Sequence, residues 1–277
     1  MNQRPSSRAG SFAAFAAFCA IALHASAAFA QDPRTPRAAT GGSPISVTVT
    51  VNISEGNATY DPATLPEDKH PDLKALAEGY AAQFKAAEPN FFQGFRERDF
   101  VREMLGGLRD IQRGTGEDAF HLPGLPIFTA FNVTSVNSET DGLGGVVEIV
   151  SHGISVRVLP SDADQTLTDH ENGHREIFKY YYKTVQAQYL QKEILRVISA
   201  KHYATIAALQ AEVRTLATTL APAFVTAVGD QNDYQDVKPA SYDVATDHGQ
   251  LGDQNAEAQK VRDAILAKAK ATYPADF

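Results

Sequence analysis

The segment His170-Glu171-Asn172-Gly173-His174 combines two imidazoles and a carboxylate at a spacing that suits metal chemistry. Residues four apart lie on one face of an α-helix, one turn apart, so both imidazoles can bind the same ion. Glu171 projects about 100° away around the helix axis. It is poorly placed as a further ligand, but it can reach a water bound to the ion and act on it as a general base.

This spacing is the H-E-x-x-H pattern of zinc metallopeptidases. It predicts a Zn²⁺-dependent hydrolase of peptide bonds, with His170 and His174 as metal ligands and Glu171 as the catalytic base. Apolar residues continue the same helical face after the motif, at Ile177, Phe178, Tyr181 and Val185. We therefore expect the ligand face to point into the protein.

A catalytic zinc needs a third protein ligand, and the residues themselves leave three candidates open. Glu193 is expected on the same long helix, too far along it to reach the ion. Glu212 belongs to a later helix and is sterically acceptable. The segment 242–249 offers a histidine and two aspartates in a loop, and loops often supply functional residues.

Three elements in order carry a family resemblance: residues 156–160 (VRVLP), the segment 170–174, and Tyr242-Asp243 followed by Thr246, His248-Gly249 and Gln254. They resemble the bacterial family of predicted secreted zinc-dependent proteases, long catalogued as a domain of unknown function. The likeness covers residues 127–260. It implies His248 as the third metal ligand, with Asp243 as the alternative, and gives Tyr242 a catalytic role at the developing oxyanion.

The elements that must position these residues follow from periodicity. Alternation of apolar and polar residues over 45–53 predicts a strand, and two β-branched runs, 127–136 and 146–159, predict a β-hairpin. Helical patterns cover 72–87, 90–105, most of 162–228 and 254–270, and 106–126 is expected to be mostly loop. The predicted fold is α+β and zincin-like: a small antiparallel sheet packed against the H-E-x-x-H helix, with further C-terminal helices.

Zincin-type sites hold the substrate peptide as an added strand on a sheet edge beside the metal helix. By that analogy we expect residues 154–159, directly before the helix, to form the edge, with Arg157 affecting peptide turnover. His121 and His202 have no partner at ligand spacing, and His152, in a predicted strand, is expected to pack or to face solvent rather than to bind a metal.

The N-terminal thirty residues are typical of a secretory signal peptide. Arg4 and Arg8 precede an apolar run over 12–23, and an A-x-A pattern ends at Ala30, the expected cleavage site. The predicted product is secreted or periplasmic. Residues 31–43 are expected to be a flexible lead-in, and 44–277 a single domain with an N-terminal part, 44–125, and a metal-site core, 126–277.

Composition limits the classes of partner. The formal net charge is −8, and removal of the two signal arginines makes the chain more acidic, which disfavours nucleic acid. The single cysteine, Cys19, lies in the signal, so a metal site must use His, Asp or Glu. We expect a peptide or protein substrate and no membrane span in the mature chain, and we find no indication of an oligomeric state. The alternative is a non-catalytic helical envelope binding protein whose metal is structural or absent.

Overall fold

The computed structural model describes residues 45–134, 145–201, 203–237 and 241–277. These all belong to one compact unit, Thr40–Phe277. The expected signal peptide, 1–30, and the lead-in, 31–43, lie outside the described residues. Within the described part, every helix is too short or too polar to cross a membrane.

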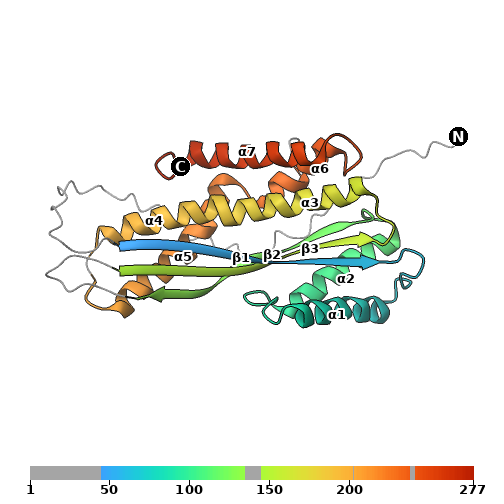
Figure 1. The fold of residues 1–277 in the computed structure, drawn as a ribbon, viewed down its shortest axis with the longest axis horizontal. Helices are drawn as coiled ribbons and strands as arrows, with labels where there is room; N and C mark the ends of the chain where they lie inside the picture. The colour runs from blue at the N-terminus through green and yellow to red at the C-terminus, as the bar shows by residue number, and fades with distance from the viewer. Residues whose placement is uncertain (1–44, 135–144, 202, 238–240) are drawn as a thin grey trace. The chain divides into compact units, whose positions relative to one another are not determined.

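A three-stranded mixed sheet forms the centre of this unit, in the order β1-β3-β2 (Figure 1). β2 (Phe120–Val133) pairs antiparallel with β3 (Gly145–Pro160), which confirms the predicted hairpin. β1 (Ile45–Tyr60) pairs with β3 in parallel, so the expectation of a purely antiparallel sheet is wrong. The connection between β1 and β2 contains two helices, so it is long enough to carry the chain from one edge of the sheet to the other. β3 then returns between these two strands, parallel to β1.

β3 is the central strand, and residues 154–158 pair with both neighbours. The expectation that residues 154–159 form the free sheet edge is therefore wrong, and the edges are β1 and β2. Arg157 donates to Oδ1 of Asn57 at 3.0 Å and to the carbonyl of Thr168 at 3.4 Å. It ties β3 to β1 and to the start of the following helix.

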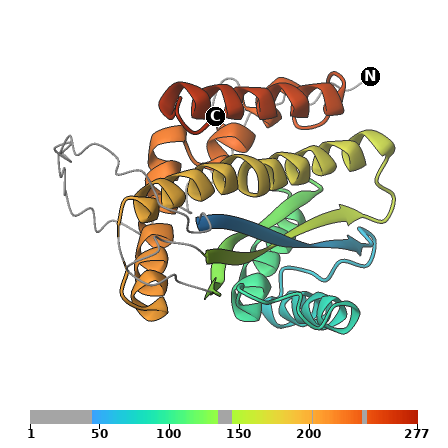
Figure 2. The same cartoon turned by 60° about the vertical axis from the view of Figure 1, so that its left-hand side comes forward.

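The two faces of the sheet are covered by different helices (Figures 1 and 2). α1 (His70–Ala87) and α2 (Glu97–Arg113) cover one face. They pack against inward residues from the second halves of β1 and β3, namely Ala58, Tyr60, Ile154, Val156 and Val158. In the first halves of β1 and β3, odd-numbered residues point to the other face of the sheet, because side chains alternate along a strand. They form part of a second core, namely Val47, Val49, Val51, Val147 and Ile149.

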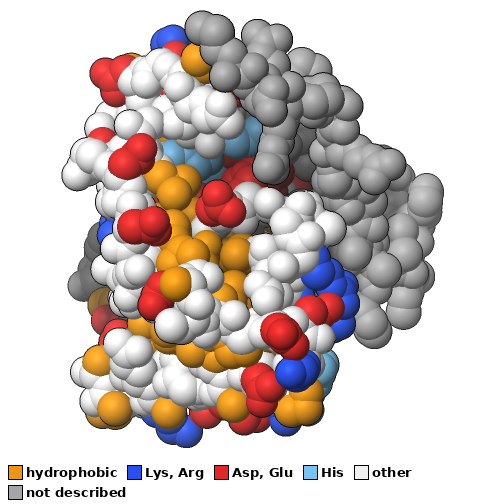
Figure 3. Space-filling model, turned by 90° about the vertical axis from the view of Figure 1, so that its right-hand side faces the viewer, with side chains coloured by type: hydrophobic (Ala, Val, Ile, Leu, Met, Phe, Trp, Pro, Cys, Tyr) orange, Lys and Arg blue, Asp and Glu red, His pale blue; other side chains and the backbone are white. Residues whose placement is uncertain are grey.

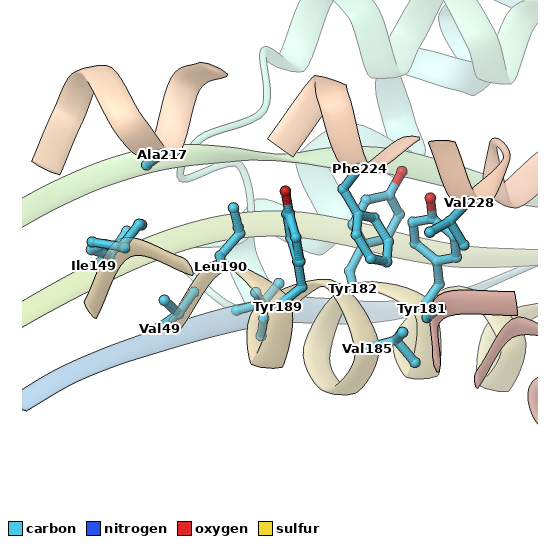
Figure 4. Close-up of a cluster of buried hydrophobic side chains, with 14 of the residues drawn as sticks. Val49, Ile149, Tyr181, Tyr182, Val185, Tyr189, Leu190, Ala217, Phe224 and Val228 are labelled. Carbon is cyan, nitrogen blue, oxygen red and sulfur yellow. The ribbon is translucent and has the colours of Figure 1, made fainter. Parts of the chain in front are cut away.

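The second core is formed mainly by the long helical run after β3. α3 (Gln165–Lys179), the π-helix η1 (Tyr180–Gln186) and α4 (Ala187–Ser199) follow one another without a break. α5 (Ile206–Val228) then returns across the sheet, so most of 162–228 is helical as expected, with one helix ending at Ser199 and the next beginning at Ile206. Aromatic side chains fill the space between the run and α5 (Figure 4), including Tyr181, Tyr182, Tyr189 and Phe224.

The expected loop over 106–126 is largely regular structure. α2 extends to Arg113, later than the predicted end at residue 105, and β2 already begins at Phe120. β2 accommodates its prolines because it is an edge strand with a register shift between Gly124 and Ile127. Gly153 lies opposite this irregularity, where a Cβ would come within 2.7 Å of the Gly124 carbonyl.

The orientation of α3, which carries the predicted metal motif, is fixed at both ends. Asp164 caps its N-terminus by accepting a hydrogen bond from the amide of Leu167 at 2.8 Å. Near its C-terminus the buried Arg175 donates to Oδ1 of Asn57 on β1 at 3.0 Å. α7 (Gln254–Thr272) packs on the side of α3 that faces away from the sheet (Figure 2). The motif therefore lies between the sheet and the C-terminal helices.

Candidate metal centre

Three buried side chains bring their ligand atoms together at the first half of α3. The Nε2 atoms of His170 and His174 are 3.2 Å apart, and Oδ1 of Asp243 lies 3.3 Å and 2.8 Å from them, respectively. Tetrahedral zinc with ligand bonds of about 2.0–2.1 Å separates its ligand atoms by about 3.3 Å. The triangle thus has the size of one face of such a coordination sphere, and the three residues are positioned to hold a metal ion.

Asp243 comes from α6 (Tyr242–Thr246), a short helix distant in sequence from α3. Its side chain is almost fully buried, and Oδ1 faces the two imidazole nitrogens without a regular hydrogen bond to either. A buried carboxylate oxygen without a donor is costly unless a cation compensates it. A carboxylate oxygen that faces two imidazole nitrogens in a buried site has the contacts expected of a metal ligand.

The charges of these residues are strongly coupled. Burial alone would raise the pKa of Asp243, but His174 and His170 hold it well below its usual range. Burial alone would lower the pKa of His174, but the Asp243 and Glu171 carboxylates raise it to about 10. Without an ion, a protonated His174 therefore pairs with Asp243, and a cation must displace that proton.

Two buried glutamines orient the imidazoles. Oε1 of Gln254, at the start of α7, lies 3.1 Å from Nδ1 of His170, and Oε1 of Gln235 lies 2.9 Å from Nδ1 of His174. The amide group of Gln254 is itself fixed, since its nitrogen donates to the carbonyl of Leu251 at 2.9 Å. Each glutamine oxygen accepts the Nδ1 proton, which leaves the Nε2 lone pair of each ring free for a metal.

Glu171 is also buried, at 1% exposure, and its Oε2 has no hydrogen-bond partner among the described residues. Burial raises its pKa to about 8. A divalent cation beside it would lower this pKa again and favour the carboxylate. Its position on the same helical turn as the two histidines agrees with the prediction from spacing.

Tyr242 is completely buried against the two imidazoles, stacked on His170 at a centroid distance of 4.9 Å and edge-on to His174 at 5.0 Å. Its hydroxyl lies 3.4 Å from the backbone and side-chain oxygens of Gln254. The ring also presses on α3, because a Cβ on Gly173 would lie 2.0 Å from the Tyr242 hydroxyl. These contacts show that Tyr242 packs against the ligands and holds them in place. Its role at an oxyanion stays a prediction.

Of the two residues that the resemblance implied as third ligand, the structure brings Asp243 and not His248 into one group with the two histidines. His248 follows α6, its side chain is 51% exposed, and its Nδ1 contacts Glu117. Asp243, the alternative, takes the place beside the two histidines. α6 is followed by two left-handed residues, Asp247 (φ 47°) and His248 (φ 53°), and in this turn the His248 ring lies against Glu117.

The other two candidates for the third ligand are engaged elsewhere. Glu193 on α4 pairs with Arg196, and Glu212 on α5 pairs with Lys201. In the described part of the chain, neither carboxylate lies close enough to the two histidines to share a metal ion with them.

Three residues near the centre were not assigned from the sequence. Gln235, in the short π-helix η2 (Asp233–Val237), carried no signal in the sequence, because a lone glutamine has no characteristic spacing. His121 on β2 lies parallel to the His174 ring at 6.3 Å and contacts Oγ of Ser155 at 2.7 Å, and burial lowers its pKa well below the usual value. Glu117, between α2 and β2, places a carboxylate oxygen within 4.8 Å of ligand atoms of both His170 and Glu171.

The surface drawn in Figure 3 gathers histidine and acidic side chains, with a band of hydrophobic side chains beside them. The partly exposed members of the centre, Glu117 and His248, are 41% and 51% exposed. They link a buried ligand triangle to solvent.

Searches against protein-family models, curated proteins and solved structures each returned no match. The candidate function is therefore inferred from the geometry of the metal centre.

Proposed function

We propose that this protein is a zinc-dependent hydrolase that cleaves peptide bonds in periplasmic or extracellular peptides or proteins. The observation that carries the proposal is the combination of three buried ligands, His170, His174 and Asp243, with an unpaired carboxylate, Glu171, on the same helical turn. Three protein ligands are typical of catalytic zinc, whereas structural sites use four. A purely structural metal site does not require a buried carboxylate such as Glu171, whose Oε2 has no hydrogen-bond donor among the described residues.

His170, His174 and Asp243 would hold the ion, and their two nitrogens and one oxygen suit zinc. A zinc ion held there supplies a Lewis acid that lowers the pKa of a bound water to about 7 and polarises a carbonyl oxygen. Glu171 accepts the proton of the attacking water and delivers it to the leaving amine. Gln235 and Gln254 keep the imidazole nitrogens directed at the ion throughout.

The substrate strand is proposed to lie along β2. β2 is a sheet edge, and its first residues carry His121 beside the His174 ring. An extended peptide can add to such an edge through backbone hydrogen bonds, which places one peptide bond next to the centre without a specific side-chain pocket. β2 thus takes the role of substrate-binding edge that was expected of residues 154–159, which lie inside the sheet.

Replacement of Glu171 by glutamine tests the proposal. Glu171→Gln keeps the size of the side chain but cannot accept a proton, so zinc binding should persist while peptide cleavage falls by at least about 10²-fold. Cleavage would be followed by mass spectrometry on a mixed peptide library, with bound zinc measured on the same samples. Glu176→Gln, on the same helix but paired with Lys179 and 38% exposed, is the matched control.

Two outcomes would contradict the proposal. One is a zinc-loaded wild-type protein that cleaves no peptide in the library. The other is cleavage by Glu171→Gln at the wild-type rate, which would show that the carboxylate takes no part in proton transfer.

A further inference from the structure

A second group of possible metal ligands shares Asp243 with the centre just described. Ligand atoms of Glu117, Asp243 and His248 all lie within 4.8 Å of one another. Glu117 comes from the turn between α2 and β2, and His248 from the turn after α6. Two segments that are distant in sequence thus meet at Asp243.

Acidic side chains gather at this end of the metal centre. Glu117 lies within 4.8 Å of Glu171 as well as of Asp243, so three carboxylates gather around the two histidines. Glu171 is 1% exposed, and its Oε2 has no hydrogen-bond partner among the described residues. A buried carboxylate oxygen without a hydrogen-bond partner is stabilised by a nearby cation.

We propose that Glu117, Asp243 and His248 form a second divalent-cation site, with the Asp243 carboxylate bridging two ions. The inference rests on the proposed centre at His170 and His174, because Asp243 serves both sites. Hydrolytic two-metal centres hold their ions about 3.5–4 Å apart, a distance that one carboxylate spans with its two oxygens. In the structure, Nδ1 of His248 and a carboxylate oxygen of Glu117 contact each other.

The two sites differ in exposure, which sets their relative affinity. His170 is fully buried, whereas the side chains of Glu117 and His248 are 41% and 51% exposed. The second ion therefore exchanges more readily with solvent. Its two carboxylates and one imidazole suit zinc, cobalt or manganese. The second ion adds positive charge on the solvent side of the centre, where a substrate carbonyl would arrive.

Metal stoichiometry tests this site. The mature protein, freed of metal with a chelator, would be dialysed against buffered Zn²⁺ and, separately, Co²⁺, and bound metal per chain measured by mass spectrometry of the elements. We expect two ions in the wild type and one in Glu117→Gln and in His248→Asn. Both variants change partly exposed side chains, and two independent variants guard against a folding defect in either.

Glu148→Gln and His70→Asn, which alter exposed residues of the same types away from the centre, should keep two ions. One ion in the wild type would overturn the inference and leave the proposed function intact. Two ions in both Glu117→Gln and His248→Asn would also overturn it, since the second ion would then lie elsewhere. A wild type that binds no ion would overturn the proposed metal centre as well.

Discussion

The two buried glutamines control which nitrogen each histidine presents to the centre. Gln254 and Gln235 place carbonyl oxygens at the Nδ1 atoms of His170 and His174. Without these acceptors either imidazole could rotate or adopt the other tautomer, and the Nε2 lone pairs would no longer converge. Residues that never touch the ion therefore contribute to its affinity.

Gln235→Leu should weaken zinc binding by about 10–100-fold, the usual cost of losing such a supporting hydrogen bond. The effect arises because His174 loses the acceptor for its Nδ1 proton. Competition with a chromophoric chelator would measure the affinity. Gln188→Leu, which removes a hydrogen bond to the carbonyl of Asp276, is the control, and equal affinities for the two variants would rule out this orienting role.

Zinc binding should release protons and strengthen as pH rises. The pKa of metal-free His174 is about 10, so the ring holds a proton at every pH below that value. Zinc must displace it, and affinity should rise by about tenfold per pH unit per displaced proton between about pH 6 and pH 9. Calorimetry in buffers of different ionisation enthalpy would count the protons released. A binding enthalpy that is independent of the buffer would contradict the protonated state.

At the scale of elements, the centre depends on the close approach of α3 and α6. Tyr242, the first residue of α6, sits directly over Gly173 on α3. The absence of a side chain at residue 173 lets the Tyr242 ring stack on His170 and brings Asp243 to the two imidazoles. The glycine inside the metal motif is thus explained by packing between helices.

Gly173→Ala should both destabilise the protein and weaken metal binding. Its Cβ would lie 2.0 Å from the Tyr242 hydroxyl, and such overpacking costs about 1–3 kcal/mol. Gly79→Ala is the matched control, because Gly79 lies inside α1 with nothing within 4 Å of an added Cβ. That substitution should stabilise by about 0.5–1 kcal/mol. Denaturant unfolding would compare them, and equal stability of the two variants would refute the contact.

For the whole molecule, the ligand set joins parts of the chain that are distant in sequence. His170 and His174 lie on α3, and Asp243 lies on α6. An ion held by both helices cross-links the helical run to the C-terminal segment. Binding that requires the folded arrangement must stabilise that arrangement.

Zinc should therefore raise the unfolding temperature. At a free concentration about 100-fold above its dissociation constant, the ion adds about 2.7 kcal/mol, which corresponds to roughly 5–10 °C for a domain of this size. Thermal unfolding followed by circular dichroism, with zinc and then with chelator, would measure the shift. His174→Ala should show no such shift. An unchanged midpoint in the wild type would argue against an ion joining these helices.

The sequence by itself determined the features that depend on short-range periodicity. The spacing of His170, Glu171 and His174 was sufficient to place them on one helical turn, and the apolar residues after them predicted an inward face. Alternation predicted β1, and the β-branched runs predicted the β2–β3 hairpin. These patterns depend only on residues close together in the sequence, so they predict local structure without knowledge of the tertiary contacts.

Only the tertiary structure decided which distant groups meet. The choice of Asp243 over His248 depends on where α6 begins and on two left-handed residues that end it. The placement of β3 in the middle of the sheet depends on how β1 crosses over. Gln235 and Glu117 reach the centre through packing of separate helices and turns. Such contacts arise from burial of complementary faces across the whole chain, and no local spacing encodes them.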